Sequence, residues 1–468
     1  MLEHLPDARD TRPTLIGRAP APAAHHRTGV RRRPGQLVAL GFAAAIAVGT
    51  VVLRLPVASQ DGPATWLEAL FTATSAVCVT GLVVVDTATH WSGFGQVVIL
   101  VLIQVGGLGI MTLATLLGLL ISRRLGLGSR LVVAAATRTV DLGDVRSVLL
   151  GVVRVSLLVE SVVAVVLTLR LWLGLGETPG RAAWFGVFHA ISAFNNAGFS
   201  TRSDSLMGYV ADPWVLLPVA GAVVLGGIGF PVLFELRRQH RRPSRWSLHT
   251  KITLVATGVL LPLGALFVLA AEWGNPRTLG GLDVPGKLLA GVFESVMTRT
   301  AGFNALPTGD MRDGTWLGTD VLMFIGGGSG GTAGGIKVTT FAVLGYVIWS
   351  ELRGDPDVTT FDRRISPTVQ RQALAVALIS VAAVVVSTLA IALSSPFTVD
   401  RVLFEVVSAF ATVGLSTGIT ADLGPGHQLL LVVLMFVGRL GPITLGTALA
   451  LRERNRLFRH PEAAPIVG

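Results

Sequence analysis

A segment of ten or eleven residues that occurs four times is the strongest constraint on how this chain folds. Each copy begins with Phe and ends with a glycine that Leu or Phe follows. The four glycines recur at spacings of 117, 104 and 112 residues. Internal repetition on this scale predicts four copies of one structural unit. The copies run over Phe71–Gly81, Phe188–Gly198, Phe293–Gly302 and Phe404–Gly414.

A proline lies 17 to 19 residues before each of these glycines. Proline is favoured at the first helical position, so each is expected to start a short helix of about three turns that ends a few residues before the glycine. Glycine then allows backbone angles that other residues avoid. The carbonyl end of a short helix is the negative end of its dipole, and four such ends aimed at one axis would favour a cation. The prolines are Pro63, Pro179, Pro285 and Pro396.

The composition is that of a polytopic membrane protein. Hydrophobic residues make up 51% of the 468, charged residues 14%, and the mean hydropathy is +0.66. Residues 63–76 are too short to cross a bilayer, which needs about 20 helical residues, and so predict a re-entrant pore helix. The predicted fold is therefore all-α, with four span–pore helix–span repeats. Eight spans and four re-entrant pore helices would surround a pseudo-fourfold pore.

The repeats divide the chain into six parts. A disordered, basic cytoplasmic tail comes first and a second cytoplasmic tail comes last. The predicted parts are 1–36 (tail), 37–122 (repeat 1), 147–236 (repeat 2), 252–350 (repeat 3), 372–452 (repeat 4) and 453–468 (tail). The predicted first spans are Gln36–Val52, Val148–Trp172, Ile252–Ala271 and Ala373–Leu393; the second spans are Val97–Ile121, Pro213–Phe234, Asp320–Trp349 and Leu429–Leu451.

The net charge of +10 follows the predicted topology. Of 38 Lys and Arg residues, 26 fall in five segments that lie on one side of the membrane if each repeat crosses twice. Positive charge collects in short cytoplasmic loops, so both termini are expected in the cytoplasm. Nine cations fall on the opposite side, and Arg154, Lys337 and Arg439 fall within spans. The basic residues therefore mainly indicate the topology in the lipid bilayer, with attraction to anionic lipid as a secondary role, and nucleic acid is not an expected partner.

Repeat 3 contains a second unusual segment, the glycine loop of residues 326–335. Seven of its ten residues are glycine, each costing a helix about 1 kcal/mol relative to alanine. Irregular backbone at membrane depth must be buried in protein or line a cavity. We therefore predict a gate, with Arg439 as a latch that donates to its carbonyls; Lys337 fits either a role in the gate or an ordinary ion pair or snorkelling position. The gate residues are Gly326, Gly327, Gly328, Ser329, Gly330, Gly331, Thr332, Gly334 and Gly335, with Lys337 and Arg439.

An enzyme is not expected, because no nucleophile–base, paired-carboxylate or metal-ligand pattern occurs. The fingerprint Gly326-x-Gly328-x-x-Gly331 lacks the alternating strands and helices of a dinucleotide fold, so no organic cofactor is predicted. Asp86, Glu294 and Glu405 lie close to the repeated motifs. They fit two interpretations: concentrating cations at an entrance, or ordinary capping and pairing.

Taken together, the four motifs, the segment Thr298–Phe303, the glycine loop and Arg439 resemble the Trk/Ktr/HKT superfamily of potassium transporters. The chain is most similar to the bacterial KtrB-type membrane subunit. The resemblance implies K⁺ as the transported ion and stimulation by Na⁺. It also implies a homodimer in the bacterial plasma (inner) membrane, opened by a cytoplasmic ring of KtrA-type subunits that binds ATP or ADP. The filter residues that carry over are Val79, Thr80, Gly81, Asn196, Ala197, Gly198, Thr300, Ala301, Gly302, Thr412, Val413 and Gly414.

Two other functions stay open beside channel-like flux. A Trk-type or alternating-access cation symporter would use broken helices around a midplane site, although such carriers usually show inverted twofold repeats. A membrane scaffold or sensor without flux would need four filter-like motifs by accident.

Overall fold

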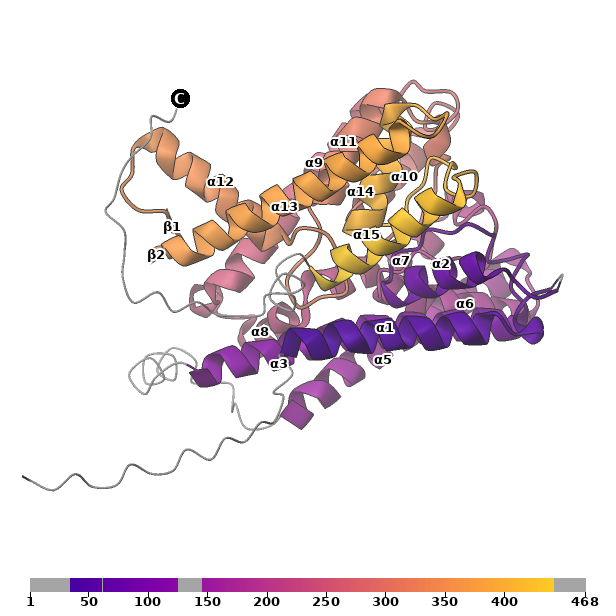
Figure 1. Ribbon diagram of the computed structural model, residues 1–468, viewed down its shortest axis with the longest axis horizontal. Coiled ribbons are helices and arrows are strands. Elements are labelled where there is room, and N and C mark those ends of the chain that lie inside the picture. Colours follow the sequence, from indigo (N-terminus) through magenta and orange to yellow (C-terminus); the bar gives the residue numbers. More distant parts are fainter. Residues whose placement is uncertain (1–33, 61, 125–144, 442–468) are drawn as a thin grey trace, which may run out of the picture.

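The computed structural model describes residues 34–60, 62–124 and 145–441. Some predicted regions fall wholly or partly outside these residues: the two tails, residues 123–146 between predicted repeats 1 and 2, and the end of the last predicted span. Within them the chain is almost entirely helical (Figure 1). The only strands in this part are β1 (Thr359–Thr360) and β2 (Arg363–Arg364), which form a short hairpin beside helix α12 (Val338–Arg353).

Four short helices, one in each repeat, end just before the repeated glycines. Two begin at or next to their proline, as predicted. In repeats 1 and 4 the prediction is wrong, because the helices begin three residues after Pro63 and Pro396. Thr65 is the N-cap in repeat 1 and forms a capping box with Glu68, which fixes the start there. The short helices are α2 (Trp66–Val77), α6 (Pro179–Phe194), α10 (Val284–Met297) and α14 (Val399–Ala411).

Ten further α-helices in the described part of the chain, most of them longer, flank the short ones. Among the described residues, three segments are long and apolar enough to cross a membrane: 149–174, 248–272 and 367–392. The α7–α8 pair is a fourth if it is one broken span. The helices are α1 (Pro34–Leu53), α3 (Gly93–Arg124), α5 (Val145–Leu169), α7 (Pro213–Ile228), α8 (Phe230–Gln239), α9 (Leu248–Glu272), α11 (Asp313–Phe324), α12 (Val338–Arg353), α13 (Pro367–Ala392) and α15 (Pro425–Leu440).

Two second helices are broken, and only one break was expected. In repeat 3 the glycine loop separates α11 from α12, as predicted. In repeat 2 the predicted continuous span Pro213–Phe234 is wrong, because α7 and α8 meet at an angle of 96°. Gly229 lies between them with φ 103°, outside the helical region, and Pro231 has no N–H to continue the helix.

The helices close into a ring of four repeats. The second helix of each repeat packs against the short helix of the next: α3 on α6, α7 on α10, and α11 on α14. Helix α15 of repeat 4 then packs against α2 of repeat 1. The last described helix therefore lies beside the first repeat, as the yellow α15 and the indigo α2 in Figure 1 show.

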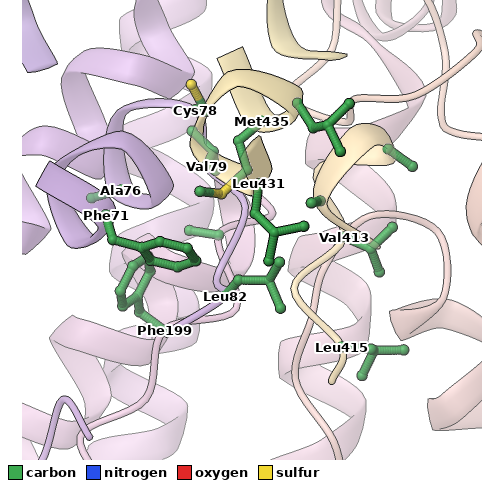
Figure 2. Packing of buried hydrophobic residues seen from close by; sticks show 14 of the residues in the cluster. Phe71, Ala76, Cys78, Val79, Leu82, Phe199, Val413, Leu415, Leu431 and Met435 are labelled. Atoms are coloured by element: carbon green, nitrogen blue, oxygen red, sulfur yellow. The ribbon is translucent and has the colours of Figure 1, made fainter. Parts of the chain in front are cut away.

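The repeated phenylalanines form part of the core. Phe71, Phe188, Phe293 and Phe404 are at most 1% exposed. In Figure 2, Phe71 lies with Phe199 and Leu82 near the chain segment that holds Val413. Burying an aromatic side chain of this size contributes about 1.5–3 kcal/mol. The motif therefore anchors each short helix in the core.

Candidate functional site

The residue two positions before each repeated glycine has the left-handed αL conformation. Three of the four are β-branched, a side-chain type for which positive φ is a true outlier. Such conformations cost about 1–3 kcal/mol each and persist only where their surroundings impose them. Their occurrence at one position in all four repeats indicates a shared geometric requirement. The residues are Val79 (φ 55°), Asn196 (59°), Thr300 (68°) and Thr412 (52°).

The repeated glycines, Gly81, Gly198, Gly302 and Gly414, contact one another in cyclic order, and we call them the glycine ring. A Cβ built on Gly81 would lie 2.5 Å from the Ala197 carbonyl oxygen, and one on Gly198 would lie 2.7 Å from that of Ala301. The same overlap relates Gly302 to Val413 and Gly414 to Thr80. The fourth contact returns to the first repeat, so the ring is closed. All four glycines have positive φ, between 70° and 96°.

Side chains of the short helices hold the non-helical segments that form this ring. Ser75 Oγ accepts from the Gly81 N–H, and Ser408 Oγ accepts from the Gly414 N–H, both at 3.0 Å. Ser192 Oγ donates to the Phe199 carbonyl at 2.8 Å. In these three repeats a serine of the short helix therefore fixes the backbone that follows it.

The residue after each repeated phenylalanine also binds the chain beyond the ring, in three of the repeats. Glu294 accepts from the N–H groups of Ala305 (2.9 Å) and Leu306 (3.1 Å). Glu405 accepts from the Thr417 N–H at 2.8 Å, and His189 Nε2 lies 2.9 Å from Ser200 Oγ. Both carboxylates are almost fully buried. Of the two interpretations left open for Glu294 and Glu405, these contacts favour the structural one.

Asp86 differs from these two glutamates because it is only partly buried. Its carboxylate accepts from Thr89 Oγ1 at 3.0 Å and from the hydroxyl of Ser203 in repeat 2. It therefore connects two loops next to the ring and still faces solvent in part.

Backbone carbonyl oxygens and threonine hydroxyls lie around the ring. The hydroxyls of Thr80, Thr300 and Thr412 are buried and have no hydrogen-bond partner among the described residues. The same residues contain no cluster of three His, Cys, Asp or Glu side chains that could hold a metal ion. Carbonyls and hydroxyls without carboxylates suit a weakly bound alkali cation that must leave again.

The glycine loop donates hydrogen bonds to carbonyls at the C-terminal end of helix α7. The last carbonyls of a helix have no partner in the helix itself. Here the N–H of Gly328 donates to Gly227 O (2.8 Å) and that of Thr332 to Gly226 O (3.1 Å), while Phe230 N–H donates to Gly330 O (3.2 Å). The unexpected break at Gly229 therefore creates the docking position for the loop.

The loop also contacts two of the αL residues. Thr332 Oγ1 donates to Asn196 Oδ1 at 2.8 Å and lies 3.3 Å from Phe194 O. Gly334 packs so closely on Thr412 that a Cβ would overlap its hydroxyl. The structure thus brings the predicted gate residues against predicted filter residues of repeats 2 and 4.

Two buried arginines donate to the carbonyls of the loop. Arg439, 4% exposed, donates from Nη1 to Thr332 O and from Nη2 to Gly106 O (3.5 Å). Arg299, 7% exposed, donates from Nη2 to Gly326 O at 3.3 Å. Lys337 Nζ donates within the segment, to Ala333 O.

Arg299 was not predicted as a site residue, because the charge pattern placed it among the nine cations on the external side. Its position three residues before Gly302 could have indicated otherwise, because the equivalent residues in the other repeats are uncharged. Arg299 is buried because the segment after α10 turns inward toward the glycine loop.

Comparison with known proteins places this geometry in a family. The family model of TrkH, described as cation transport protein, matches residues 36–459. The chain belongs to the TrkH family. It is 42% identical to the Ktr system potassium uptake protein B of Bacillus subtilis (strain 168), over 94% of this chain and 98% of that protein. It is 39% identical to the protein of the same name from Vibrio alginolyticus, over 92% and 94% of the two chains.

Two further matches show how far the similarity to known proteins extends. The potassium/sodium uptake protein NtpJ of Enterococcus hirae is 34% identical over 94% of this chain and 98% of that protein. The crystal structure of the potassium transporter TrkH from Vibrio parahaemolyticus matches with a TM-score of 0.70 at 20% identity, covering 92% of this chain and 87% of that one. This match shows that the helical fold of the TrkH family is shared.

Proposed function

We propose that this chain is the potassium-translocating membrane subunit of a Ktr-type uptake system. The observation that carries the proposal is the closed glycine ring, in which each glycine meets the carbonyl that precedes the next. Rings of backbone carbonyls replace the water shell of K⁺ in potassium filters. The names of the two Ktr relatives and of NtpJ support K⁺ as the ion.

Each repeat would contribute two spans and one re-entrant short helix to a pore on the ring axis. The ends of α2, α6, α10 and α14 would direct their negative dipole ends toward the ion. The residues at and before the ring, those that sequence analysis assigned to the filter, would supply the carbonyls and hydroxyls. Flux would be passive and channel-like.

The glycine loop would be the gate, held closed by the bonds described above. Its partners lie on α7, on the αL residues and on two arginines, so its release would require several contacts to break together. We propose that a cytoplasmic, nucleotide-binding KtrA-type ring supplies that free energy to a homodimer of this chain, and that Na⁺ stimulates uptake. The membrane would be the bacterial inner membrane, with both termini in the cytoplasm.

Growth of a potassium-uptake-deficient bacterium at low K⁺ tests the proposal. Co-expression of this chain with a regulatory subunit is expected to restore growth. Normal membrane insertion without rescue would overturn it. Flux measured in liposomes distinguishes channel-like transport from a Trk-type or alternating-access symporter. A channel-like protein passes K⁺ in response to voltage with no coupled ion, whereas a symporter requires a coupled ion.

A further inference from the structure

A small cavity lies beside the glycine loop, between α7, α9 and α10. Its walls include Val223, Ile228, Thr257, Leu261, Val296 and Arg299. Its volume, counted as the space that the centre of a water molecule can occupy, is about 20 Å³. A volume of about 10–15 Å³ on this measure accommodates one water molecule, so the cavity suits a single ligand of about that size.

Arg299 supplies a charged group to the wall of this cavity. Its side chain is more than nine-tenths buried and donates from Nη2 to Gly326 O, but Nε and Nη1 have no hydrogen-bond partner in the part of the chain that the structure describes. No acidic side chain of residues 34–60, 62–124 or 145–441 forms a salt bridge with it. A buried charge without a partner is strongly destabilising, so a guanidinium in this position calls for a counter-ion.

Thr257 adds a second donor to the same wall. Its buried hydroxyl also has no hydrogen-bond partner. The other walls are mainly Val, Ile and Leu side chains, which offer neither acceptors nor negative charge. Several N–H and O–H donors around an apolar space of one-atom size are complementary to a monatomic anion.

We propose that this cavity binds one small monovalent anion, of the halide class, as the counter-ion of Arg299. Chloride is the abundant member of that class. Arg299 directly precedes Thr300, so an uncompensated charge there would repel a cation at the proposed filter. This consequence rests on the proposed function, whereas the anion site itself does not.

Anomalous scattering from bromide locates the anion. Crystals of the full-length protein grown in bromide are expected to give a peak in contact with the Arg299 guanidinium and the Thr257 hydroxyl. Arg299→Gln is expected to lose the peak. Absence of a peak in well-ordered crystals of the parent overturns the proposal, because the cavity would then hold water or nothing.

Thermal unfolding in detergent measures the affinity in solution. Chloride is replaced stepwise by gluconate at constant K⁺ and ionic strength, since a ligand of the folded state raises Tm with its concentration. We expect Thr257→Val, which keeps the side-chain shape, to require about tenfold more chloride for the same rise.

Thr253→Val is the matched control, one turn away on α9, because the Thr253 hydroxyl donates to its own helix at His249 O (2.8 Å). It should respond to chloride as the parent does. A chloride response that is unchanged in both Arg299→Gln and Thr257→Val overturns the proposal. Neither measurement involves transport, so a protein that binds bromide but passes no K⁺ would overturn only the proposed function.

Discussion

At the residue scale, the same strained backbone appears four times while the side chains differ. Val79, Asn196, Thr300 and Thr412 share positive φ although they include an aliphatic, an amide and two hydroxyl side chains. The repeated feature is therefore the peptide backbone, which is expected if carbonyl oxygens do the work at this site. The side chains are free to take local tasks, as Asn196 does with Thr332.

Replacing a ring glycine is expected to impair ion discrimination because the added Cβ would overlap a neighbouring carbonyl. The backbone strain of a side chain at positive φ would add to this effect. In Gly198→Ala the new Cβ would meet the Ala301 carbonyl, so we expect weaker discrimination of K⁺ from Na⁺ or lower flux, with assembly intact. Gly176→Ala is the matched control. Gly176 has φ 72°, close to the 70° of Gly198, but a Cβ there meets nothing within 4 Å.

The control is expected to lose about 1 kcal/mol of stability from strain and to transport normally. Competition of Na⁺ with rubidium uptake in liposomes reads out the difference. The assignment of the filter would be contradicted if substitution of each ring glycine in turn left K⁺ affinity and Na⁺ discrimination unchanged.

At the element scale, the glycine loop is a segment without a fold of its own. Seven glycines give it little intrinsic conformational preference, and its position is set by bonds to α7, Asn196, Arg299 and Arg439. A segment held only by its partners can change position when a few of them are lost. This property is what the proposed gate requires.

Arg439→Ala is expected to raise basal flux in the absence of any cytoplasmic partner. Hydrogen bonds from a charged group are worth about 1.5–3 kcal/mol each, so losing one shifts the closed population about 10- to 150-fold. Rubidium uptake into liposomes measures this. Arg371→Ala, which removes an exposed charge, is the control and should behave as the parent. If deletion of most of the loop and Arg439→Ala both leave the protein closed, the loop is a structural kink.

Thr332→Val tests the hydrogen bonds that the Thr332 hydroxyl makes to repeat 2, of which the one to Asn196 is the shorter. It keeps the side-chain volume and removes the hydroxyl that donates to Asn196 Oδ1. A neutral hydrogen bond of about 0.5–1.5 kcal/mol predicts a rise in basal flux of about 2- to 12-fold. Thr340→Val, on the first turn of α12, removes a hydroxyl for which the structure records no hydrogen bond and should have no effect. Equal fluxes for the two variants would show that this contact does not hold the gate.

At the scale of the whole molecule, ring closure depends on contacts between the two ends of the described chain. Helix α15 lies on α2, and Gly414 meets Thr80 more than 300 residues earlier in the sequence. The ring axis is therefore formed only when all four repeats are in place. The topology proposed for this assembly places the segment between α8 and α9 in the cytoplasm and the turns beside the ring outside.

Single-cysteine labelling tests that topology. The one natural cysteine, Cys78, is fully buried, so the parent should not react with a membrane-impermeant maleimide. Asp422→Cys, at an exposed position before α15, should react in intact cells. Arg241→Cys, at an exposed position between α8 and α9, should react only after the membrane is permeabilised. The reverse pattern would invert the proposed orientation.

The sequence determined the fourfold frame and the break in repeat 3. Regular glycine spacing, a short helix before each glycine and seven glycines in ten residues are local signals, because each depends on what neighbouring residues allow the backbone to do. Hence the four motifs and the interruption of α11–α12 could be predicted. Proline was a weaker guide, since the caps at Thr65 and Thr398, and not Pro63 and Pro396, precede two of the short helices.

Only the tertiary structure decided what those parts contact. The 96° bend at Gly229, the burial of Arg299 and the donation from Thr332 to Asn196 depend on residues far apart in sequence. Gly229 and Pro231 permit a bend, but the bend is stabilised where the loop of repeat 3 supplies N–H groups for the open carbonyls of α7. Arg299 is counted as an external cation until the loop carbonyl that accepts its hydrogen bond is placed beside it. Such partners are fixed by packing across repeats, which local sequence does not encode.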